Sequence, residues 1–451
     1  MDAQPCVQLW CLLTAGALAA VSGAPVQDSP ATGKFWHISD LHLDYTYHMT
    51  EDPTKVCFSS KGHPVLNPGE FGDYMCDSPY ELIQSALNFM KQAGHLTDFI
   101  IWTGDSPPHV PVKKLSTNIV IQTLSNMTDT IRKYFPDLQV YPALGNHDYW
   151  PQDQFPVSTN EIYQAAADLW QPWLKPEALK TLREGGFYSQ LVQPGLRLLS
   201  LNTNLYYSPN KETVNMMDPA GQLQWLLETL ESSRQSNEKV YVIAHVPIGY
   251  LPYAFNTTAL RQVHNERLVQ IFRKYSDVIV GQFYGHTHRD SIMVLLDDQG
   301  TPVSSLFVTP AVTPIKNARE PYSNNPGVRL YKYDPQSFAM LDVVQYFLNL
   351  TEANEEQKAN WKLEYTMTEV FDIKDVEPQS LLKLAKSFAT PHSKAFEKYF
   401  NHFMVSYNDT IVCQGLCKVL QVCAVQFLDS ATYRQCVEGW LSAEGLDDNL
   451  P

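Results

Sequence analysis

The stretch that decides the fold is Phe35-Trp36-His37-Ile38-Ser39-Asp40-Leu41-His42. It begins as a short, largely apolar run of the kind that forms a buried strand, and it ends in a carboxylate and an imidazole two residues apart. Aspartate and histidine are ligand types that suit divalent metal ions. The stretch therefore predicts a strand that delivers Asp40 and His42 to a metal site.

Four further segments of the same kind follow along the chain. In each, an apolar run is followed at once by Asp, Asn or His, so that carboxylate, amide and imidazole ligands accumulate. All five segments in one order predict a two-metal site and a hydrolase that acts on phosphorus. The further segments are Gly104-Asp105, Gly145-Asn146-His147-Asp148, Ala244-His245-Val246-Pro247 and Gly285-His286-Thr287-His288.

Stretches with helical spacing separate the apolar runs, so strand and helix alternate over most of the chain. This alternation predicts an α/β fold, in which ligands gather at the carboxyl ends of the strands. Motifs that are far apart in the sequence are therefore expected to meet in space. We expect helices over 79–93, 116–135, 218–233 and 260–275, and strands over 98–102, 138–144, 196–201, 240–243, 278–284, 291–296, 304–308 and 328–333.

Changes in pattern along the chain define the expected domains. Residues 34–345 carry the metal-binding segments and are expected to form the catalytic domain. From residue 350 the pattern becomes helical, as over 381–388 and 394–403, so 350–451 is expected to form a helical C-terminal subdomain. Residues 1–24 are largely apolar and end in small residues, which predicts a cleaved signal peptide.

Cysteines and sequons also fit a secreted protein. After removal of residues 1–24, six cysteines remain, an even number that suits three disulfides in an oxidising compartment. Sequence proximity favours Cys57 with Cys76 and pairs the other four among themselves, although the pairing is formally open. We expect secretion, with the lysosomal lumen as a second compartment. The other cysteines are Cys413, Cys417, Cys423 and Cys436, and glycosylation sequons begin at Asn126, Asn256, Asn349 and Asn408.

The charge of the chain excludes one class of partner. There are 33 Lys and Arg against 48 Asp and Glu, which gives a net charge of −15. An acidic surface repels polyanions, so binding of long nucleic acid is not expected. A small anionic substrate stays compatible, because bound metal ions are then the largest local charges.

Four longer strings indicate the family that the chain resembles. They are similar to those of the acid sphingomyelinase branch of the calcineurin-like metallophosphoesterase superfamily, over essentially the whole mature chain. The resemblance implies a β-sandwich flanked by helices, with a helical, disulfide-containing C-terminal subdomain. The strings are Phe35-Trp36-His37-Ile38-Ser39-Asp40-Leu41-His42, Trp102-Thr103-Gly104-Asp105, Gly145-Asn146-His147-Asp148 and Phe283-Tyr284-Gly285-His286-Thr287-His288.

The resemblance also implies a ligand set for two zinc ions. Two carboxylates with neutral amide and imidazole ligands keep both ions electrophilic, and imidazole-rich ligation suits zinc. Purple acid phosphatases carry a tyrosine three residues after the bridging aspartate to bind ferric iron, and Pro108 occupies that position here. The implied ligands are Asp40, His42 and His288 for one ion, Asn146, His245 and His286 for the other, and Asp105 as the bridge.

The resemblance further implies in-line attack on phosphorus by a hydroxide that bridges the two ions. The leaving oxygen then needs a proton. His147, beside the ligand Asn146, and His109, four residues after Asp105, are the expected acid or phosphate-stabilising groups. Asp148 is expected to orient His147 or its loop.

Aromatic side chains near the motif-bearing strands are candidates for substrate binding. A tyrosine or tryptophan face stacks on a nucleobase or receives a choline head group. Ordinary packing is an equally good interpretation for each of them. The candidates are Tyr149, Trp150, Tyr206, Tyr207 and Tyr250.

The surroundings of the motifs favour a soluble substrate. We expect no saposin-type domain ahead of the first segment and no membrane anchor, because residues 443–451 are polar and acidic. The resemblance implies nucleotide-type substrates, namely ATP-like nucleotides, CDP-choline and cyclic dinucleotides such as cGAMP. Two alternatives stay open: a sphingomyelin or phospholipid phosphodiesterase, and a non-catalytic secreted glycoprotein. A monomer is expected.

Overall fold

The computed structural model describes residues 32–94, 97–316 and 322–444 of the 451-residue chain. The predicted signal peptide, residues 1–24, and the last residues of the predicted C-terminal subdomain lie outside the described residues. Within these three ranges, no helix combines the length and the apolar character needed to cross a bilayer.

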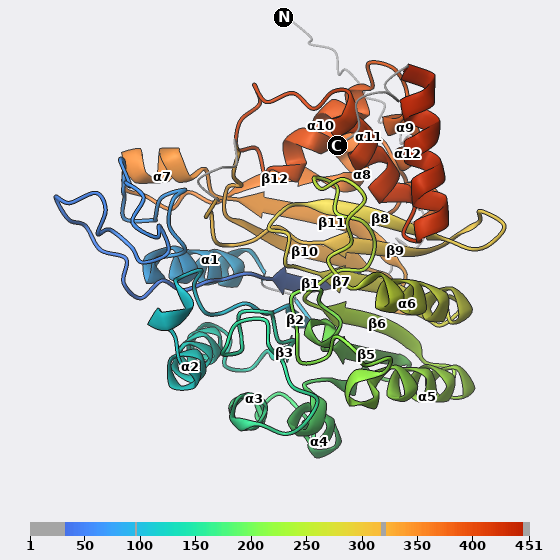
Figure 1. The fold of residues 1–451 in the computed structure, drawn as a ribbon, viewed down its shortest axis with the longest axis horizontal. Coiled ribbons are helices and arrows are strands. Elements are labelled where there is room, and N and C mark those ends of the chain that lie inside the picture. Colours follow the sequence, from blue (N-terminus) through green and yellow to red (C-terminus); the bar gives the residue numbers. More distant parts are fainter. Residues whose placement is uncertain (1–31, 95–96, 317–321, 445–451) are drawn as a thin grey trace, which may run out of the picture. The chain divides into compact units, whose positions relative to one another are not determined.

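Two six-stranded mixed sheets form the centre of the fold (Figure 1). The strands in the described ranges are β1 (Gly33–Ile38), β2 (Phe99–Trp102), β3 (Gln139–Pro142), β4 (Tyr188–Gln193), β5 (Leu196–Leu201), β6 (Lys239–Ala244), β7 (Ile279–Tyr284), β8 (Ser291–Leu296), β9 (Pro302–Val308), β10 (Gly327–Tyr333), β11 (Met340–Phe347) and β12 (Lys362–Thr366). The first sheet has the order β12-β11-β10-β1-β2-β3 and the second β4-β5-β6-β7-β9-β8. β1, β2 and β3 run parallel, as do β5, β6, β7 and β9. Each sheet therefore gathers the carboxyl ends of several strands at one edge.

The two sheets pack on each other through aromatic side chains. The Phe35 ring on β1 lies 5.7 Å from the Tyr241 ring on β6 and 5.3 Å from the Phe283 ring on β7, measured between centroids. Within its own sheet, Phe35 stacks on Phe99 of β2 at 4.7 Å. All four side chains are buried, and such pairs contribute beyond the apolar area that they bury. The predicted β-sandwich is confirmed.

Helices flank the sheets, as expected. Helix α1 begins after Pro79 and ends before Gly94, and its buried residues Leu82, Leu87 and Met90 belong to one amphipathic face. The helices in the described ranges are α1 (Tyr80–Ala93), α2 (Thr117–Tyr134), α3 (Glu161–Trp170), α4 (Pro176–Gly185), α5 (Gln222–Gln235), α6 (Gln262–Lys274), α7 (Leu350–Glu356), α8 (Met367–Phe371), α9 (Pro378–Phe388), α10 (Lys394–Phe403), α11 (Leu416–Gln426) and α12 (Ser430–Glu444), with the 3-10 turns η1 (Val112–Lys114), η2 (Thr203–Leu205) and η3 (Pro219–Gly221).

Each element that the sequence predicts is present, with ends that shift by about one helical turn or less. Three strands of the sandwich, β4, β11 and β12, and the helices α3 and α4 were not predicted; β12 lies in the region that was expected to be helical. β4 is a partly exposed edge strand, with residues of intermediate or full exposure along most of its length. Its sequence therefore lacks the continuous apolar run that marks a buried strand.

The region from residue 350 onward is mainly helical, and it is tied into the sandwich. β12 pairs antiparallel with β11 and extends the first sheet. In the second sheet, α9 contacts β8 and β9, and α11 contacts β8. Disulfides Cys413–Cys417 and Cys423–Cys436 lie in this region, whereas Cys57–Cys76 closes a loop before α1. The favoured pairing of the cysteines is confirmed. The division at residues 345–350 stays a prediction.

A buried network, built on one ion pair, joins the region from residue 350 onward to the loop that carries the last predicted metal ligand. Arg329 on β10 is fully buried, and its guanidinium contacts the Asp290 carboxylate two residues after His288. The same guanidinium donates to Gln345 Oε1 at 2.7 Å and to the Tyr365 hydroxyl at 3.3 Å. That hydroxyl in turn donates to Asp290 Oδ2 at 2.6 Å. Strands β10, β11 and β12 thus share one polar network with the loop.

Replacing Arg329 by methionine should lower the free energy of unfolding by about 3–5 kcal/mol, because Asp290 is left as an unpaired buried charge. Arg183→Met is the matched control: it removes a pair with Asp168 whose side chains are 33% and 70% exposed, and it should cost less than about 1 kcal/mol. Urea unfolding with the disulfides intact, followed by tryptophan fluorescence, measures both variants. Equal losses would show that the network contributes no more than a surface pair.

Candidate metal centre

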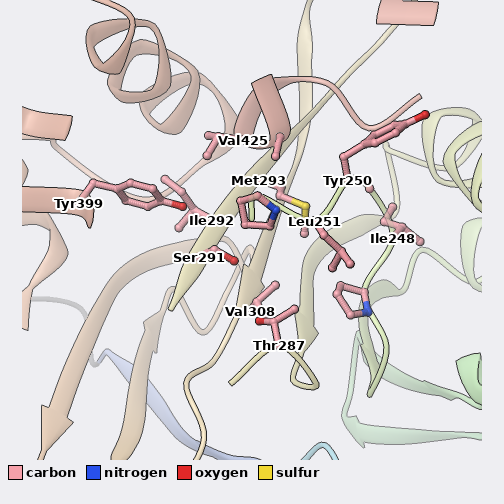
Figure 2. A pocket seen from close by; sticks show the side chains of 14 residues that line it. Ile248, Tyr250, Leu251, Thr287, Ser291, Ile292, Met293, Val308, Tyr399 and Val425 are labelled. Carbon is pink, nitrogen blue, oxygen red and sulfur yellow. The ribbon is translucent and has the colours of Figure 1, made fainter. Parts of the chain in front are cut away.

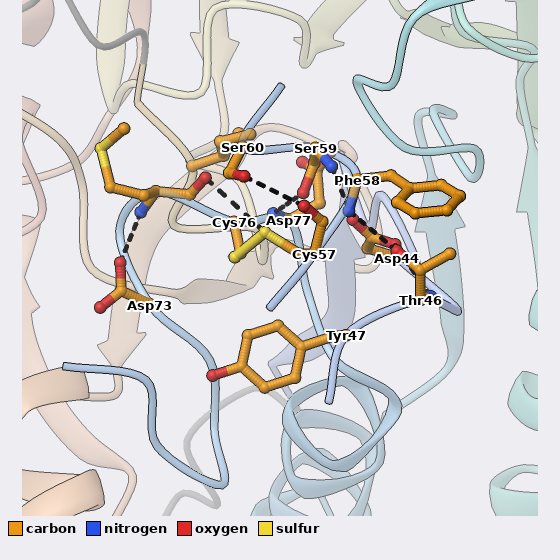
Figure 3. The surroundings of a disulfide bond; sticks show 12 residues. Asp44, Thr46, Tyr47, Cys57, Phe58, Ser59, Ser60, Asp73, Cys76 and Asp77 are labelled. Carbon is orange, nitrogen blue, oxygen red and sulfur yellow. Dashed lines mark hydrogen bonds between the residues drawn. A yellow bond between two sulfur atoms is a disulfide. The ribbon is translucent and has the colours of Figure 1, made fainter. Parts of the chain in front are cut away.

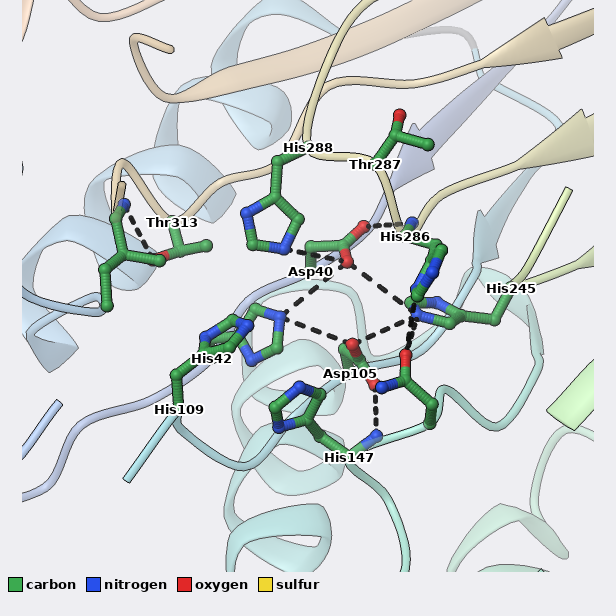
Figure 4. A network of polar contacts seen from close by, with 12 residues as sticks. Asp40, His42, Asp105, His109, His147, His245, His286, Thr287, His288 and Thr313 are labelled. Carbon is green, nitrogen blue, oxygen red and sulfur yellow. Dashed lines mark hydrogen bonds and ion pairs between the residues drawn. The ribbon is translucent and has the colours of Figure 1, made fainter. Parts of the chain in front are cut away.

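The carboxyl ends of five strands bring the predicted ligands together (Figure 4). Loops that leave the parallel strands of the first sheet meet loops that leave the second sheet. The backbone N–H of Asp40 donates to Gly104 O, and that of Gly285 donates to His245 O, both at 3.0 Å. Asp40 and His42 follow β1, Asp105 follows β2, Asn146 follows β3, His245 follows β6, and His286 and His288 follow β7.

Asp40 and Asp105 lie at the middle of the cluster. Asp40 Oδ1 is 3.7 Å from His42 Nε2 and 3.4 Å from His288 Nε2. Asp105 Oδ2 is 3.4 Å from His42 Nε2 and 3.0 Å from His245 Nε2. The donor atoms of Asp40, Asp105 and His245 all lie within 4.8 Å of one another. Carboxylate oxygens and imidazole nitrogens therefore face one shared centre.

The Asn146 amide completes the other side of the centre. Its Oδ1 lies 2.9 Å from His245 Nε2 and 2.9 Å from His286 Nδ1. Its Nδ2 donates to Asp153 Oδ1 at 2.8 Å, which turns the amide oxygen toward the two imidazoles. The sequence did not point to Asp153, because it follows the motif within a loop that has no periodic pattern.

The pattern of hydrogen bonds fits a metal site. Asp40 Oδ1 and His42 Nε2 are buried and have no hydrogen-bond partner, although unpaired buried polar atoms are costly. The second nitrogen of each ring is occupied: His42 Nδ1 is 2.7 Å from Pro107 O, and His245 Nδ1 is 2.6 Å from Thr103 O. Metal-bound histidines have such outer hydrogen bonds, which fix the ring and its tautomer. The donor set therefore fits divalent metal ions.

The backbone is strained at most of these ligands. A positive φ is uncommon for residues other than glycine, and it costs on the order of 1–3 kcal/mol unless the surroundings impose it. Its concentration at ligand positions indicates that the loops are bent to aim side chains at the centre. The ligands concerned are Asp40 (φ 53°), His42 (39°), Asp105 (62°), His286 (73°) and His288 (61°).

Two glycines of the motifs are required by close approach. A Cβ atom on Gly145 would lie 2.1 Å from Asp105 Oδ1, and one on Gly285 would lie 2.0 Å from Ser39 Oγ. Neither distance is sterically possible, so any larger residue would displace a carboxylate ligand or the loop beside it. The glycines therefore let the ligand loops of β1, β2, β3 and β7 pack against one another.

The charges at the centre favour a cation. Burial opposes ionisation of Asp40 and Asp105, but the facing imidazoles, His245 first, outweigh it and hold the pKa of both carboxyls well below the ordinary value. Burial likewise opposes protonation of His245, yet Asp105 and Asp40 raise its pKa to about 9. Two ionised carboxylates in a buried site thus demand positive charge from protons or metal ions.

His109 and His147 lie on the same centre, beside His42. The His109 ring is 4.1 Å from the His42 ring and 4.3 Å from the His147 ring, between centroids. One nitrogen of each of the three lies within 4.8 Å of the others, a spacing that also suits a metal ion. Burial lowers the pKa of both His109 and His147, and neighbouring imidazoles lower it further. Both candidate acids are therefore next to the predicted ligands.

Asp148 ties two ligand loops together. Its carboxylate accepts from the backbone N–H groups of Asp105 and Ser106 at 2.9 Å each and of Gly145 at 2.8 Å. Burial, followed by the charge of Asp105, raises the pKa of Asp148 to about 6. Of the two expected roles, Asp148 therefore has the one that orients the loop, and these bonds do not involve the His147 ring.

Two of the aromatic candidates are packing residues. Tyr206 is 0% exposed, its ring stacks on His264 at 4.9 Å, and its hydroxyl accepts from Gln222 Nε2 at 2.8 Å. Tyr250 stacks on Tyr433 of α12 at 3.7 Å and is also buried. A buried ring has no free face for a base, so the prediction of substrate contact is corrected for both. Proximity to a motif in the sequence did not indicate the direction of these side chains.

The other aromatic candidates lie closer to the surface. The partly exposed Tyr207 ring meets the His286 ring edge to face at 4.9 Å. Tyr149 packs on Phe155 at 4.9 Å, and Trp150 Nε1 donates to Val112 O at 3.2 Å. Tyr207 is thus the candidate in direct contact with a predicted ligand.

An apolar pocket lies behind the ligand loops (Figure 2). It lies between the loop after β6, strand β8 and helices α10 and α11. Its lining includes Ile248, Thr287, Met293, Tyr399 and Val425. Thr287 separates the ligands His286 and His288, so the C-terminal helices back the loop that carries them.

Comparison with known proteins defines the class. Residues 33–290 match the calcineurin-like phosphoesterase family, and residues 301–442 match the acid sphingomyelin phosphodiesterase C-terminal region. The chain belongs to the calcineurin-like phosphoesterase family, and the resemblance found in its motifs is confirmed. The second match begins in β-strands well before residue 350, which agrees with a C-terminal region that shares the sheets.

Curated relatives cover nearly the whole chain. It is 60% identical to the cyclic GMP-AMP phosphodiesterase SMPDL3A of Bos taurus over 92% of each chain. The protein of the same name from Homo sapiens is 58% identical over 95% of this chain and 96% of its own. Acid sphingomyelinase-like phosphodiesterase 3b of Mus musculus is 42% identical over 90% of each chain.

Replacing Asp105 by alanine removes the carboxylate that faces both halves of the centre. If the centre holds the two ions predicted from the sequence, bound metal should fall from about two ions per chain to fewer than one. Turnover should fall at least about 10³-fold, because the shared ligand is lost. Plasma mass spectrometry and hydrolysis of bis(p-nitrophenyl) phosphate measure these effects. Asp168→Ala, at an exposed ion pair, is the control. Loss of one ion with turnover intact would rule out a bridging role for Asp105.

Replacing Asp153 by alanine should free the Asn146 amide to rotate and weaken metal binding by about 10- to 100-fold, the usual cost of losing an outer hydrogen bond. Asp153→Asn keeps an acceptor oxygen in place and should cost less, on the order of threefold. Competition with a chelating dye measures both affinities. If the two variants bind metal equally, the Asp153 hydrogen bond does not orient the ligand.

Proposed function

We propose that this chain is a zinc-dependent phosphodiesterase that hydrolyses soluble nucleotide-type phosphoesters, with cyclic dinucleotides such as cGAMP as the leading substrate class. The observation that carries the proposal is that all seven implied ligands form one cluster. His42, His245 and His288 contact Asp40 or Asp105, and Asn146 contacts His245 and His286. Relatives that are 58–60% identical and named for cyclic GMP-AMP hydrolysis support the substrate class. ATP-like nucleotides and CDP-choline are further substrates under this proposal.

Zinc is favoured by the donor set. Four imidazoles, two carboxylates and one amide suit zinc better than magnesium or calcium, which prefer oxygen ligands. Pro108 takes the position where a ferric site of this superfamily needs tyrosine. When bound, two such ions supply Lewis acidity toward the phosphoryl oxygens and lower the pKa of a coordinated water.

The chain itself supplies groups for the rest of the reaction. His109 and His147 lie beside the ligands, where an imidazole N–H donates a hydrogen bond to a phosphoryl oxygen or a proton to the leaving oxygen. Tyr207 offers an aromatic ring next to His286 for a base of the substrate. Asp148 keeps the loops of Asp105 and Asn146 in place during these steps.

The proposed compartment is extracellular, with the lysosomal lumen as a second location, and the proposed unit is a monomer that binds a small soluble substrate. The three disulfides support an oxidising environment. Asn126, Asn256 and Asn408 are exposed and accessible to glycosylation, whereas Asn349 is half-buried. The Asn349 side chain accepts from the Glu352 backbone N–H at 3.1 Å at the start of α7.

A lipid phosphodiesterase is the second candidate, because residues 301–442 match the acid sphingomyelin phosphodiesterase C-terminal region. In this alternative the C-terminal helices contact lipid. A non-catalytic glycoprotein is disfavoured, because every implied ligand position is filled and a decayed site usually loses one.

Turnover on a substrate panel separates these candidates. The zinc-loaded protein should hydrolyse cGAMP, ATP and CDP-choline at pH 5 or 7 at least about tenfold faster than sphingomyelin in mixed micelles, and a chelator should abolish turnover until Zn²⁺ is restored. His286→Ala, which removes one ligand, is the inactive control. Comparable lipid turnover would favour the second candidate, and no turnover on any substrate would favour the third.

A further inference from the structure

A buried carboxylate outside the five metal-binding segments lies behind His109. Asp77 is 0% exposed. Its Oδ2 accepts from the His109 backbone N–H at 2.6 Å, and its Oδ1 lies 3.0 Å from His109 Nδ1. The Thr313 hydroxyl donates to the same Oδ1 at 3.0 Å. Both the backbone and the ring of His109 are therefore held by one carboxylate.

The two candidate acids differ in how they are held. His147 Nδ1 is buried without a hydrogen-bond partner, and His147 Nε2 lies 3.3 Å from Gln152 Nε2. Within the residues that the structure describes, no carboxylate forms a hydrogen bond with the His147 ring. His109 is of intermediate exposure, whereas His147 is buried. His109, beside His42 and His147 in Figure 4, is thus oriented by a carboxylate and less buried than His147.

Asp77 is itself fixed by the disulfide loop (Figure 3). It follows Cys76, which is bonded to Cys57. Its backbone N–H donates to Ser59 Oγ at 2.9 Å, and the Ser59 backbone N–H donates to Asp44 Oδ2 at 3.0 Å. The carboxylate behind His109 therefore belongs to a cross-linked segment with internal hydrogen bonds.

We propose that Asp77 is the positioning residue that makes His109, rather than His147, the proton donor to the leaving oxygen. This inference rests on the proposed phosphodiesterase function and assigns the roles of its two histidines.

A counter-charge is what a donor at this place needs. A protonated imidazole in a largely buried site is stable only beside an anion. Asp77 is the carboxylate in direct contact with His109, with Oδ1 3.0 Å from Nδ1. A carboxylate at Nδ1 also fixes the ring so that Nε2 carries the transferable proton.

In the proposed hydrolysis, His109 supplies the proton that the leaving oxygen needs. Water adds its oxygen to phosphorus, and the bond from phosphorus to the leaving oxygen breaks with its electron pair on that oxygen. The leaving oxygen takes the proton from His109 Nε2 and departs as an alcohol. The attacking water releases one proton to solvent, and His109 regains one from solvent, so no other reactant is consumed.

A matched pair of substrates tests the assignment. The p-nitrophenyl ester of a nucleoside 5′-phosphate and the corresponding dinucleotide share the attacked phosphoryl group but differ in the leaving group. p-Nitrophenolate leaves without a proton, whereas a ribose alkoxide needs one. Asp77→Asn should therefore lower kcat on the dinucleotide by about 100-fold, within the range for general acid catalysis, and leave kcat on the nitrophenyl ester within about threefold.

Three further variants complete the experiment. His109→Ala should show the same split between substrates, and Asp77→Asn added to His109→Ala should cause no further loss, because the two residues act as one unit. Asp375→Asn, at a buried carboxylate that accepts from the Ser380 hydroxyl and lies outside this network, should leave the ratio of the two kcat values unchanged. Metal content and thermal midpoint are measured for each variant to confirm loaded, folded protein.

The outcomes are separable. A parent protein inactive on both esters would overturn the proposed function itself. An active parent with equal losses on both esters for Asp77→Asn would overturn the positioning role. A split that appears for His147→Ala and not for His109→Ala would assign the donor to His147 and overturn the inference.

Discussion

Two buried carboxylates placed side by side, Asp40 and Asp105, set the condition that the rest of the structure satisfies. They follow adjacent parallel strands, β1 and β2, and like charges at this spacing repel strongly where water is excluded. His245 contacts both carboxylates, and His42 contacts them from the other side. The folded sandwich therefore needs positive charge, from cations or protonated imidazoles, at the edge where these two carboxylates lie.

The same condition couples parts of the chain that are distant in sequence. His245 and His286 come from the second sheet: His245 compensates charge on the first, and the His286 backbone N–H donates to Asp40 Oδ2 at 3.1 Å. The sheets are therefore joined by the centre as well as by aromatic packing. Asp290, two residues after His288, pairs with Arg329 and thereby connects the centre to β10 and the C-terminal region. This explains why the C-terminal region shares the sheets of the catalytic region rather than standing apart.

Sequence reasoning predicted that the implied ligands meet in space because each follows a buried strand, and a buried strand is visible as an apolar run. It did not recover Asp77 or Asp153, because each acts through a contact with a loop residue that no periodic pattern predicts. Asp77 is 32 residues from His109, and only the folded loop brings them together. Tyr206 was misassigned for a related reason: its place after β5 is readable, but the inward direction of its ring is not.

The centre therefore consists of two sets of residues that come from different parts of the fold: the predicted metal ligands, and His109 with the carboxylate behind it. The predicted metal ligands come from strand ends. Under the proposed function, in-line displacement would put the leaving oxygen opposite the attacking one, and its proton would come from a group other than the ligands. We assign that task to His109, an imidazole of intermediate exposure with a fixed carboxylate behind it. Discrimination between leaving groups then depends on the loop closed by Cys57 and Cys76, and not on the ligands.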